Sequence, residues 1–130
     1  MNTCYFNGNY INKDDAKVSV FDRGFLFSDG VYEVIPVYNL KPFLIHEHIK
    51  RLNDGLTELK INYDTKELYS ICNELINQNK PKKPFSIYIQ ITRGEQVKRD
   101  HRFIDISSPT IFIGLQDCSH PTSYTQAHNA

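Results

Sequence analysis

Residues 85–93 alternate between apolar and polar side chains more regularly than any other part of the chain. Four apolar residues take every second position: Phe85, Ile87, Ile89 and Ile91. Because successive side chains of a strand point to opposite faces, this pattern predicts a β-strand with one buried face. The length of 130 residues predicts a single domain around it.

Further strands are indicated by turn residues and by β-branched content. Asn7-Gly8, between two short aromatic runs, predicts a hairpin because both residues tolerate positive φ. Residues 31–38 predict a strand with apolar side chains on both faces, so we expect both faces to be covered. A tight turn at Asn39-Leu40 predicts a second hairpin with residues 41–45, and residues 110–115 predict another strand.

Two amphipathic helices are predicted between these strands. Residues 46–59 place Ile49, Leu52 and Leu56 on one stripe. The second helix opens at Asp64 and has its own apolar stripe between Leu68 and Ile76. Residues 77–84 predict a solvated loop. The resulting order predicts an α+β fold: a two-layer sandwich whose mostly antiparallel sheet is covered by two helices. We expect residues 1–116 to form this domain and residues 117–130 to form a tail.

Composition excludes several classes of function. Lys and Arg total 15 and Asp and Glu total 15, so net charge gives no reason to expect nucleic acid or an anionic membrane as a partner. No apolar run approaches the roughly 20 residues of a membrane span. Cys4, Cys72 and Cys118 form no CxxC pair, and Cys118 and His120 have no third ligand nearby, so we expect neither disulfides nor a metal site. The cytoplasm is the expected compartment.

The residues themselves suggest one carboxylate-binding site. The long loop 94–109 carries Arg99 and His101, which could both bind one carboxylate if the loop is extended there. Composition alone favours a plain charged loop. Arg51 could hold a phosphate, although on spacing alone a solvated arginine is the simpler interpretation. The ordinary interpretation of Tyr32 is a tyrosine buried in the core. Glu33 is expected either to pair with a cation or to lie at the solvent-exposed end of its strand.

Four motifs in collinear order carry a more specific signal: residues 5–8 (YFNG), 22–34 (DRGFLFSDGVYEV), 46–52 (HEHIKRL), and 90–94 (QITRG) followed by Arg99-Asp100-His101. Together they resemble the N-terminal domain of class IV (fold-type IV) pyridoxal-phosphate aminotransferases. Within that family, residues 30–34 with Arg-x-His look most like the D-amino-acid (D-alanine) aminotransferases.

The resemblance implies a role for each candidate residue. Arg51 would hold the phosphate of pyridoxal 5'-phosphate. Tyr32, Arg99 and His101 would bind the substrate α-carboxylate, with the Arg-x-His loop reaching across a homodimer interface, and Val34 would line the pocket. The implied reaction is transfer of an amino group between a D-amino acid and a 2-oxo acid.

In the family, a lysine in a second, C-terminal domain anchors the cofactor and moves the proton, and no lysine of this sequence matches it. We therefore expect no catalytic residue in these 130 residues, no cofactor bound by them alone, and no activity by themselves. Two alternatives stay open: an orphan binding or oligomerisation module from a truncated gene, and a domain like that of aminodeoxychorismate lyase. In each case an exposed docking face predicts a homodimer or higher oligomer.

Overall fold

The strand predicted from regular alternation, β5 (Phe85–Thr92), lies inside a six-stranded sheet, and both of its neighbours run antiparallel to it. The computed structural model describes residues 1–96, 99–102 and 108–117. The sheet order is β2-β1-β6-β5-β3-β4. Its other strands are β1 (Thr3–Phe6), β2 (Asn9–Asn12), β3 (Gly30–Tyr38), β4 (Lys41–Pro42) and β6 (Thr110–Asp117).

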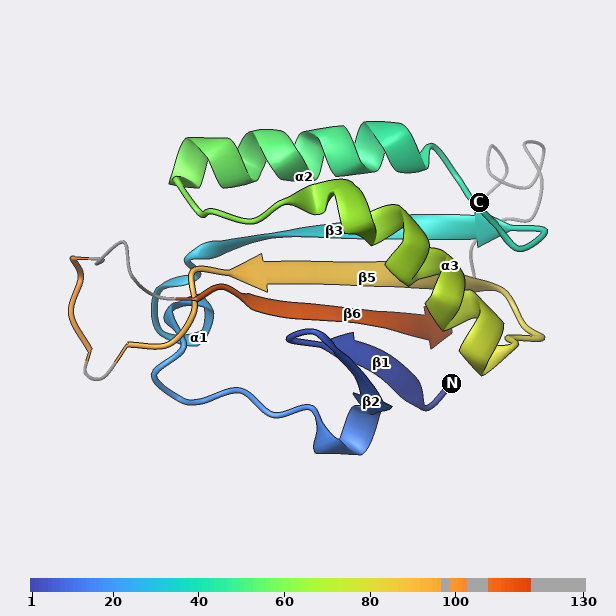
Figure 1. The fold of residues 1–130 in the computed structure, drawn as a ribbon, viewed down its shortest axis with the longest axis horizontal. Helices are drawn as coiled ribbons and strands as arrows, with labels where there is room; N and C mark the ends of the chain where they lie inside the picture. The colour runs from blue at the N-terminus through green and yellow to red at the C-terminus, as the bar shows by residue number, and fades with distance from the viewer. Residues whose placement is uncertain (97–98, 103–107, 118–130) are drawn as a thin grey trace, which may run out of the picture.

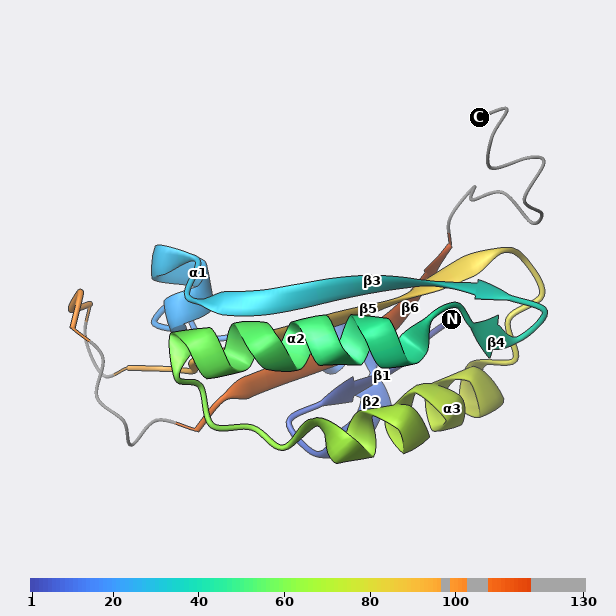
Figure 2. The same cartoon turned by 90° about the horizontal axis from the view of Figure 1, so that it is seen from above.

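Two helices, α2 (Ile45–Leu59) and α3 (Leu68–Asn79), lie on the same face of the sheet (Figures 1 and 2). A short helix, α1 (Arg23–Phe27), lies at the end of the sheet where β3 begins (Figure 1). Single 3-10 turns occur at η1 (Lys13–Asp15) and η2 (Thr65–Glu67). This arrangement confirms the predicted α+β sandwich with two covering helices.

The core lies between the helices and the alternating face of β5. Ile87, Ile89 and Ile91 are fully buried there. They pack in one cluster with the predicted helical stripes, which include Leu52 of α2 and Leu75 of α3. Removal of this apolar surface from water is the main source of stability. Cys4 and Cys72 are buried free thiols, as expected of small apolar residues.

Both predicted hairpin turns are present. Asn7 and Gly8 have φ of 47° and 97°, which is the backbone that a two-residue turn between β1 and β2 requires. Asn39 and Leu40 have φ of 52° and 61°, but the strand that follows them is only two residues long, shorter than the predicted 41–45. The reason is that Leu44, with φ of 53°, ends the extended segment and α2 begins at Ile45.

Two other elements are longer than predicted. α3 continues to Asn79, although residues 77–84 were expected to form a loop. The Asn79 side-chain amide donates to the carbonyls of Leu75 and Thr3 and accepts from the Thr3 amide, so a contact with β1 holds the last turn. β6 continues to Asp117, which pairs with Phe85. The remainder of the predicted tail, with Cys118 and His120, lies outside the described residues.

The loop after β5 starts from a position that only glycine fills easily. Gly94 has φ of +104°, and a Cβ there would collide with the carbonyl oxygen of Ser108. Gly8 has a similar φ of +97° but open space around it. We expect Gly94→Ala to lower the free energy of unfolding by about 3 kcal/mol, because strain and overpacking add, and Gly8→Ala by about 1 kcal/mol. Urea unfolding measures the free energy of unfolding of both variants. Equal losses in the two variants would contradict the close approach of residue 94 to the Ser108 carbonyl.

Candidate functional site

The two faces of β3 differ in exposure. Glu33, Ile35 and Val37 are buried beneath the helices, whereas Tyr32 is 65% exposed and Val34 39% exposed on the opposite face. Among the residues that the structure describes, the helices cover one face only, so the expected cover over the face of Tyr32 and Val34 stays a prediction. Tyr32 is not a core tyrosine, and its ring stacks on Tyr88 with 6.2 Å between the ring centroids.

Glu33 is a buried carboxylate with two partners on α2. Arg51 donates from Nε to Oε2 at 2.9 Å and from Nη2 to Oε1 at 2.8 Å, and His48 Nδ1 hydrogen-bonds Oε1 at 2.6 Å. His48 and Arg51 are three residues apart, so one helix face presents both. Burial alone would raise the pKa of Glu33, but the hydrogen bonds from Arg51 and His48 outweigh burial and lower it. The predicted pairing of Glu33 with a cation is confirmed.

Arg51 lies in a position that suits an anion. Its side chain is 72% exposed, and Glu33 holds it through Nε and Nη2. In the described residues no hydrogen bond is made by Nη1, so that edge of the guanidinium is fixed in direction and open to solvent. A planar guanidinium held in this way is suited to binding a phosphate group. The residues present therefore fit the phosphate contact that the family resemblance implies.

The lowered pKa of Glu33 predicts a pH-dependent contribution to stability. An unfolded glutamate has a pKa of about 4.3, so the unfolded chain takes up this proton first as the pH falls. The stabilisation by Glu33 is complete above that value and is lost as the pH falls through the lower folded pKa. We expect Glu33→Gln to cost about 1–3 kcal/mol at pH 7, and the difference from the wild type to shrink at acid pH.

Urea unfolding between pH 7 and pH 3 measures this difference. Glu58→Gln, a change at an exposed glutamate on α2, the helix that carries His48 and Arg51, is the matched control and is expected to stay within about 0.5 kcal/mol. If the loss of unfolding free energy in Glu33→Gln had the same size over the whole pH range, it would contradict the lowered pKa of Glu33.

Arg99 and His101 come together at one aromatic ring. The Arg99 guanidinium carbon lies 4.8 Å from the centroid of the Phe27 ring, and the His101 ring centroid lies 4.9 Å from the same ring. Both residues are exposed. The two side chains thus contact the same ring, which α1 provides. Their binding of a carboxylate stays a prediction.

Behind this loop lies a buried cluster of charges that the sequence analysis missed. Asp29 accepts from Nε of Arg23 and from Nε of Arg93, each at 2.7 Å. The two arginines are 4% and 6% exposed. Arg93 also donates to the carbonyls of Leu59 and Lys60, at the end of α2. Two opposite charges that directly precede closely spaced glycines, Arg23 before Gly24 and Asp29 before Gly30, were the available signal, because a buried charge needs a partner.

The candidate residues therefore form two groups within one chain. Arg51 and Glu33 lie on the helix side of β3, with Tyr32 and Val34 on the opposite face of the same strand. The Arg99–His101 pair lies against α1 at the end of the sheet. No hydrogen bond or ring contact joins Tyr32 to Arg99 or His101: Tyr32 stacks on Tyr88, whereas the other two lie against Phe27. In residues 1–96, 99–102 and 108–117, no group of three or more His, Cys, Asp or Glu could hold a metal ion.

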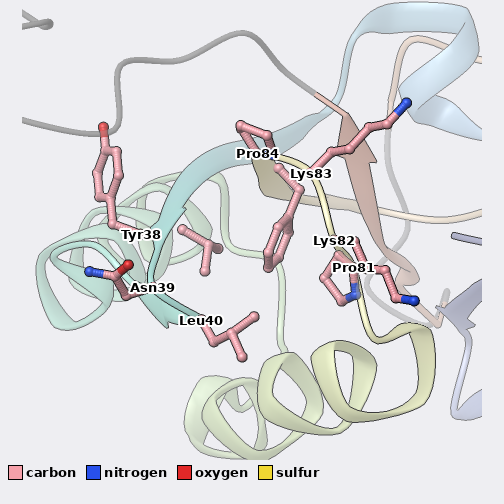
Figure 3. Close-up of a pocket in the computed structure, with 9 residues that line it drawn as sticks. Tyr38, Asn39, Leu40, Pro81, Lys82, Lys83 and Pro84 are labelled. Carbon is pink, nitrogen blue, oxygen red and sulfur yellow. The ribbon is translucent and has the colours of Figure 1, made fainter.

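The far end of β3 carries none of these residues. Figure 3 shows a pocket there, lined by residues 37–40 and 81–85. No helix in the described part of the chain is long and apolar enough to cross a membrane.

Comparison with known proteins gives a consistent result. Residues 30–127 match the family model for class IV amino-transferases. The D-alanine aminotransferase of Staphylococcus aureus (strain N315) is 40% identical over 105 residues, which are 79% of this chain and 36% of that protein. The chain thus spans about a third of the length of this relative.

Solved structures agree on the fold. The branched-chain amino acid aminotransferase of Escherichia coli superposes with a TM-score of 0.82 at 24% identity, covering 90% of this chain and 41% of that one. Another branched-chain amino acid aminotransferase, complexed with N-(5'-phosphopyridoxyl)-L-glutamate, has a TM-score of 0.78 at 18% identity, over 91% and 41% of the two chains. The 4-amino-4-deoxychorismate lyase of Pseudomonas aeruginosa has a TM-score of 0.72 at 25% identity, over 94% and 42%.

Proposed function

Because this chain belongs to the class IV aminotransferase family, we propose that it forms the substrate-carboxylate half of an enzyme that moves an amino group between a D-amino acid and a 2-oxo acid. The observation that carries the proposal is the position of Arg99 and His101, both against the Phe27 ring and both exposed. The 40% identity to a D-alanine aminotransferase supports the choice of substrate class.

Each residue has a task in this proposal. Arg99 and His101 donate hydrogen bonds to the α-carboxylate, and the exposed phenol of Tyr32 adds a further donor. Val34 lines the space beside Tyr32 and limits the substrate side chain. Arg51 holds the phosphate of pyridoxal 5'-phosphate, directed by its ion pair with Glu33. When bound, that cofactor supplies the electron sink for amino transfer.

The separation of the two groups supports a dimer. Since no hydrogen bond or ring contact joins Tyr32 to the Arg99–His101 pair within one chain, we place them together at an interface, where the loop of one protomer serves the site of its partner. The exposed apolar face of β3, with Tyr32 and Val34, provides the kind of surface that associates. We expect light scattering of concentrated protein to give a dimer or larger species, and a clean monomer would count against this arrangement.

A direct test uses the carboxylate itself. Pyruvate added to the labelled chain should shift the NMR signals of Arg99 and His101, whereas methyl pyruvate, which lacks the charge, should not. Equal shifts with both compounds, or shifts confined to other residues, would contradict the proposed site. We also propose that these 130 residues alone, mixed with pyridoxal phosphate, D-alanine and 2-oxoglutarate, do not form pyruvate steadily.

A lyase acting on aminodeoxychorismate is the second candidate, favoured by the similarity to the Pseudomonas aeruginosa enzyme. Arg99 and His101 argue for the aminotransferase, because this pair suits the small carboxylate of an amino acid. An enzyme containing this domain that released pyruvate from aminodeoxychorismate, and left D-alanine unchanged, would favour the lyase.

A further inference from the structure

Arg23 of α1 makes an unusual set of hydrogen bonds with the loop that carries Arg99 and His101. Its Nη1 lies 2.6 Å from the carbonyl oxygen of Asp100 and 3.3 Å from that of Arg102, and its Nη2 lies 3.0 Å from that of His101. Nη1 also donates to Oε1 of Gln96 at 2.8 Å. Three consecutive carbonyls of the loop thus point to one guanidinium.

We infer that Arg23 is the positioning residue for the Arg99–His101 pair and thereby sets the affinity for the substrate carboxylate. This inference rests on the proposed function. The carbonyls of residues 100–102 face the Arg23 guanidinium, whereas the side chains of Arg99 and His101 are exposed.

The Phe27 ring completes this arrangement. Arg23 lies over it, with the guanidinium carbon 4.7 Å from the ring centroid, and Arg99 and His101 contact the same ring at 4.8 and 4.9 Å. Arg23 and Phe27 are four residues apart on one short helix, so both act from a single rigid turn. The loop backbone and the two side chains are therefore fixed relative to each other by α1.

An arginine is required for this task. The guanidinium has five N–H donors in one plane, and here they reach Asp29, Gln96 and three backbone carbonyls. A lysine has three donors on one nitrogen, so it can keep the charge beside Asp29 but cannot reach this spread of acceptors. Arg23→Lys therefore separates the contribution of Arg23 to stability from its hold on the loop.

The experiment compares Arg23→Lys with Arg102→Lys in the 130-residue chain. Arg102 lies on the same loop, but its side chain is 89% exposed and pairs with Asp100, so it is the matched control. Two readouts are taken by NMR: the His101 ring signals without ligand, which the Phe27 ring current displaces, and the dissociation constant of pyruvate. We expect Arg23→Lys to move the His101 signals toward those of an exposed histidine and to weaken pyruvate binding about tenfold. Arg102→Lys should stay within about twofold, since only exposed contacts change.

The outcomes separate this inference from the proposed function. Wild-type pyruvate affinity and unchanged His101 signals in a folded Arg23→Lys variant would overturn the inference. If the wild type binds no pyruvate but Arg23→Lys still moves His101, the positioning stands and the proposed function fails. If Arg23→Lys does not fold, Gln96→Ala is the second variant, because it removes the hydrogen bond between Arg23 and the Gln96 side chain without changing Arg23 itself. It should then move the His101 signals by a smaller amount, and no movement would overturn the inference.

Discussion

Asp29→Ala is expected to lower the free energy of unfolding by about 3–5 kcal/mol, because it leaves two buried arginines without their shared carboxylate. Arg23 and Arg93 each donate to Asp29 at 2.7 Å and are almost fully buried. Burial alone would raise the pKa of Asp29, but the hydrogen bonds from Arg93 and Arg23 outweigh it and lower the pKa, so the group is charged at neutral pH. Urea unfolding at pH 7 measures the loss.

Asp54→Ala is the control for this prediction. Asp54 pairs with Lys50 on the surface of α2, where the two side chains are 65% and 78% exposed. An exposed ion pair of this kind contributes little, so we expect a change below about 0.5 kcal/mol. Similar losses for the two aspartate substitutions would show that the cluster around Asp29 is not a source of stability.

Arg99→Ala is expected to lower kcat/KM for D-alanine by about 100- to 1,000-fold, because it removes a charged donor to the substrate carboxylate. The assay uses a chimera in which this chain replaces the matched region of the Staphylococcus aureus D-alanine aminotransferase. Stopped assays of pyruvate release at several D-alanine concentrations give kcat and KM for each variant.

Arg102→Ala in the same chimera is the matched control. It removes the same charge from the same loop, but its exposed side chain faces Asp100 and has no part in the proposed site. We expect kcat/KM to change by less than about threefold. Equal losses for Arg99→Ala and Arg102→Ala would mean that general loop charge, and not a defined carboxylate contact, explains the activity.

The elements that could be predicted from sequence are those with local signals. β5 follows from its two-residue period, α2 and α3 from their apolar stripes, and the first hairpin from Asn7-Gly8. The ends of α3 and β4 could not be predicted, because they depend on a contact of Asn79 with β1 and on the backbone of Leu44. Local patterns do not contain such contacts.

The candidate site shows the same division. The pairing of Glu33 with a cation could be expected, because a carboxylate on an apolar strand face needs a partner. The alternation of side chains along β3 could not show that no other element in the described part of this chain covers the face that carries Tyr32. The cluster of Asp29 with Arg93 joins residues 64 positions apart, and the hold of Arg23 on the loop spans 77 to 79 positions. Only the fold brings these groups together.

The central claim is that this domain supplies the carboxylate-binding half of a D-amino-acid aminotransferase site. The rate of pyruvate formation from D-alanine by the chimera, with pyridoxal phosphate and 2-oxoglutarate present, tests it most directly. The Staphylococcus aureus part alone is the control. We predict turnover of D-alanine that the control lacks and that Arg99→Ala removes. A folded chimera that binds the cofactor but leaves D-alanine unchanged would contradict the claim.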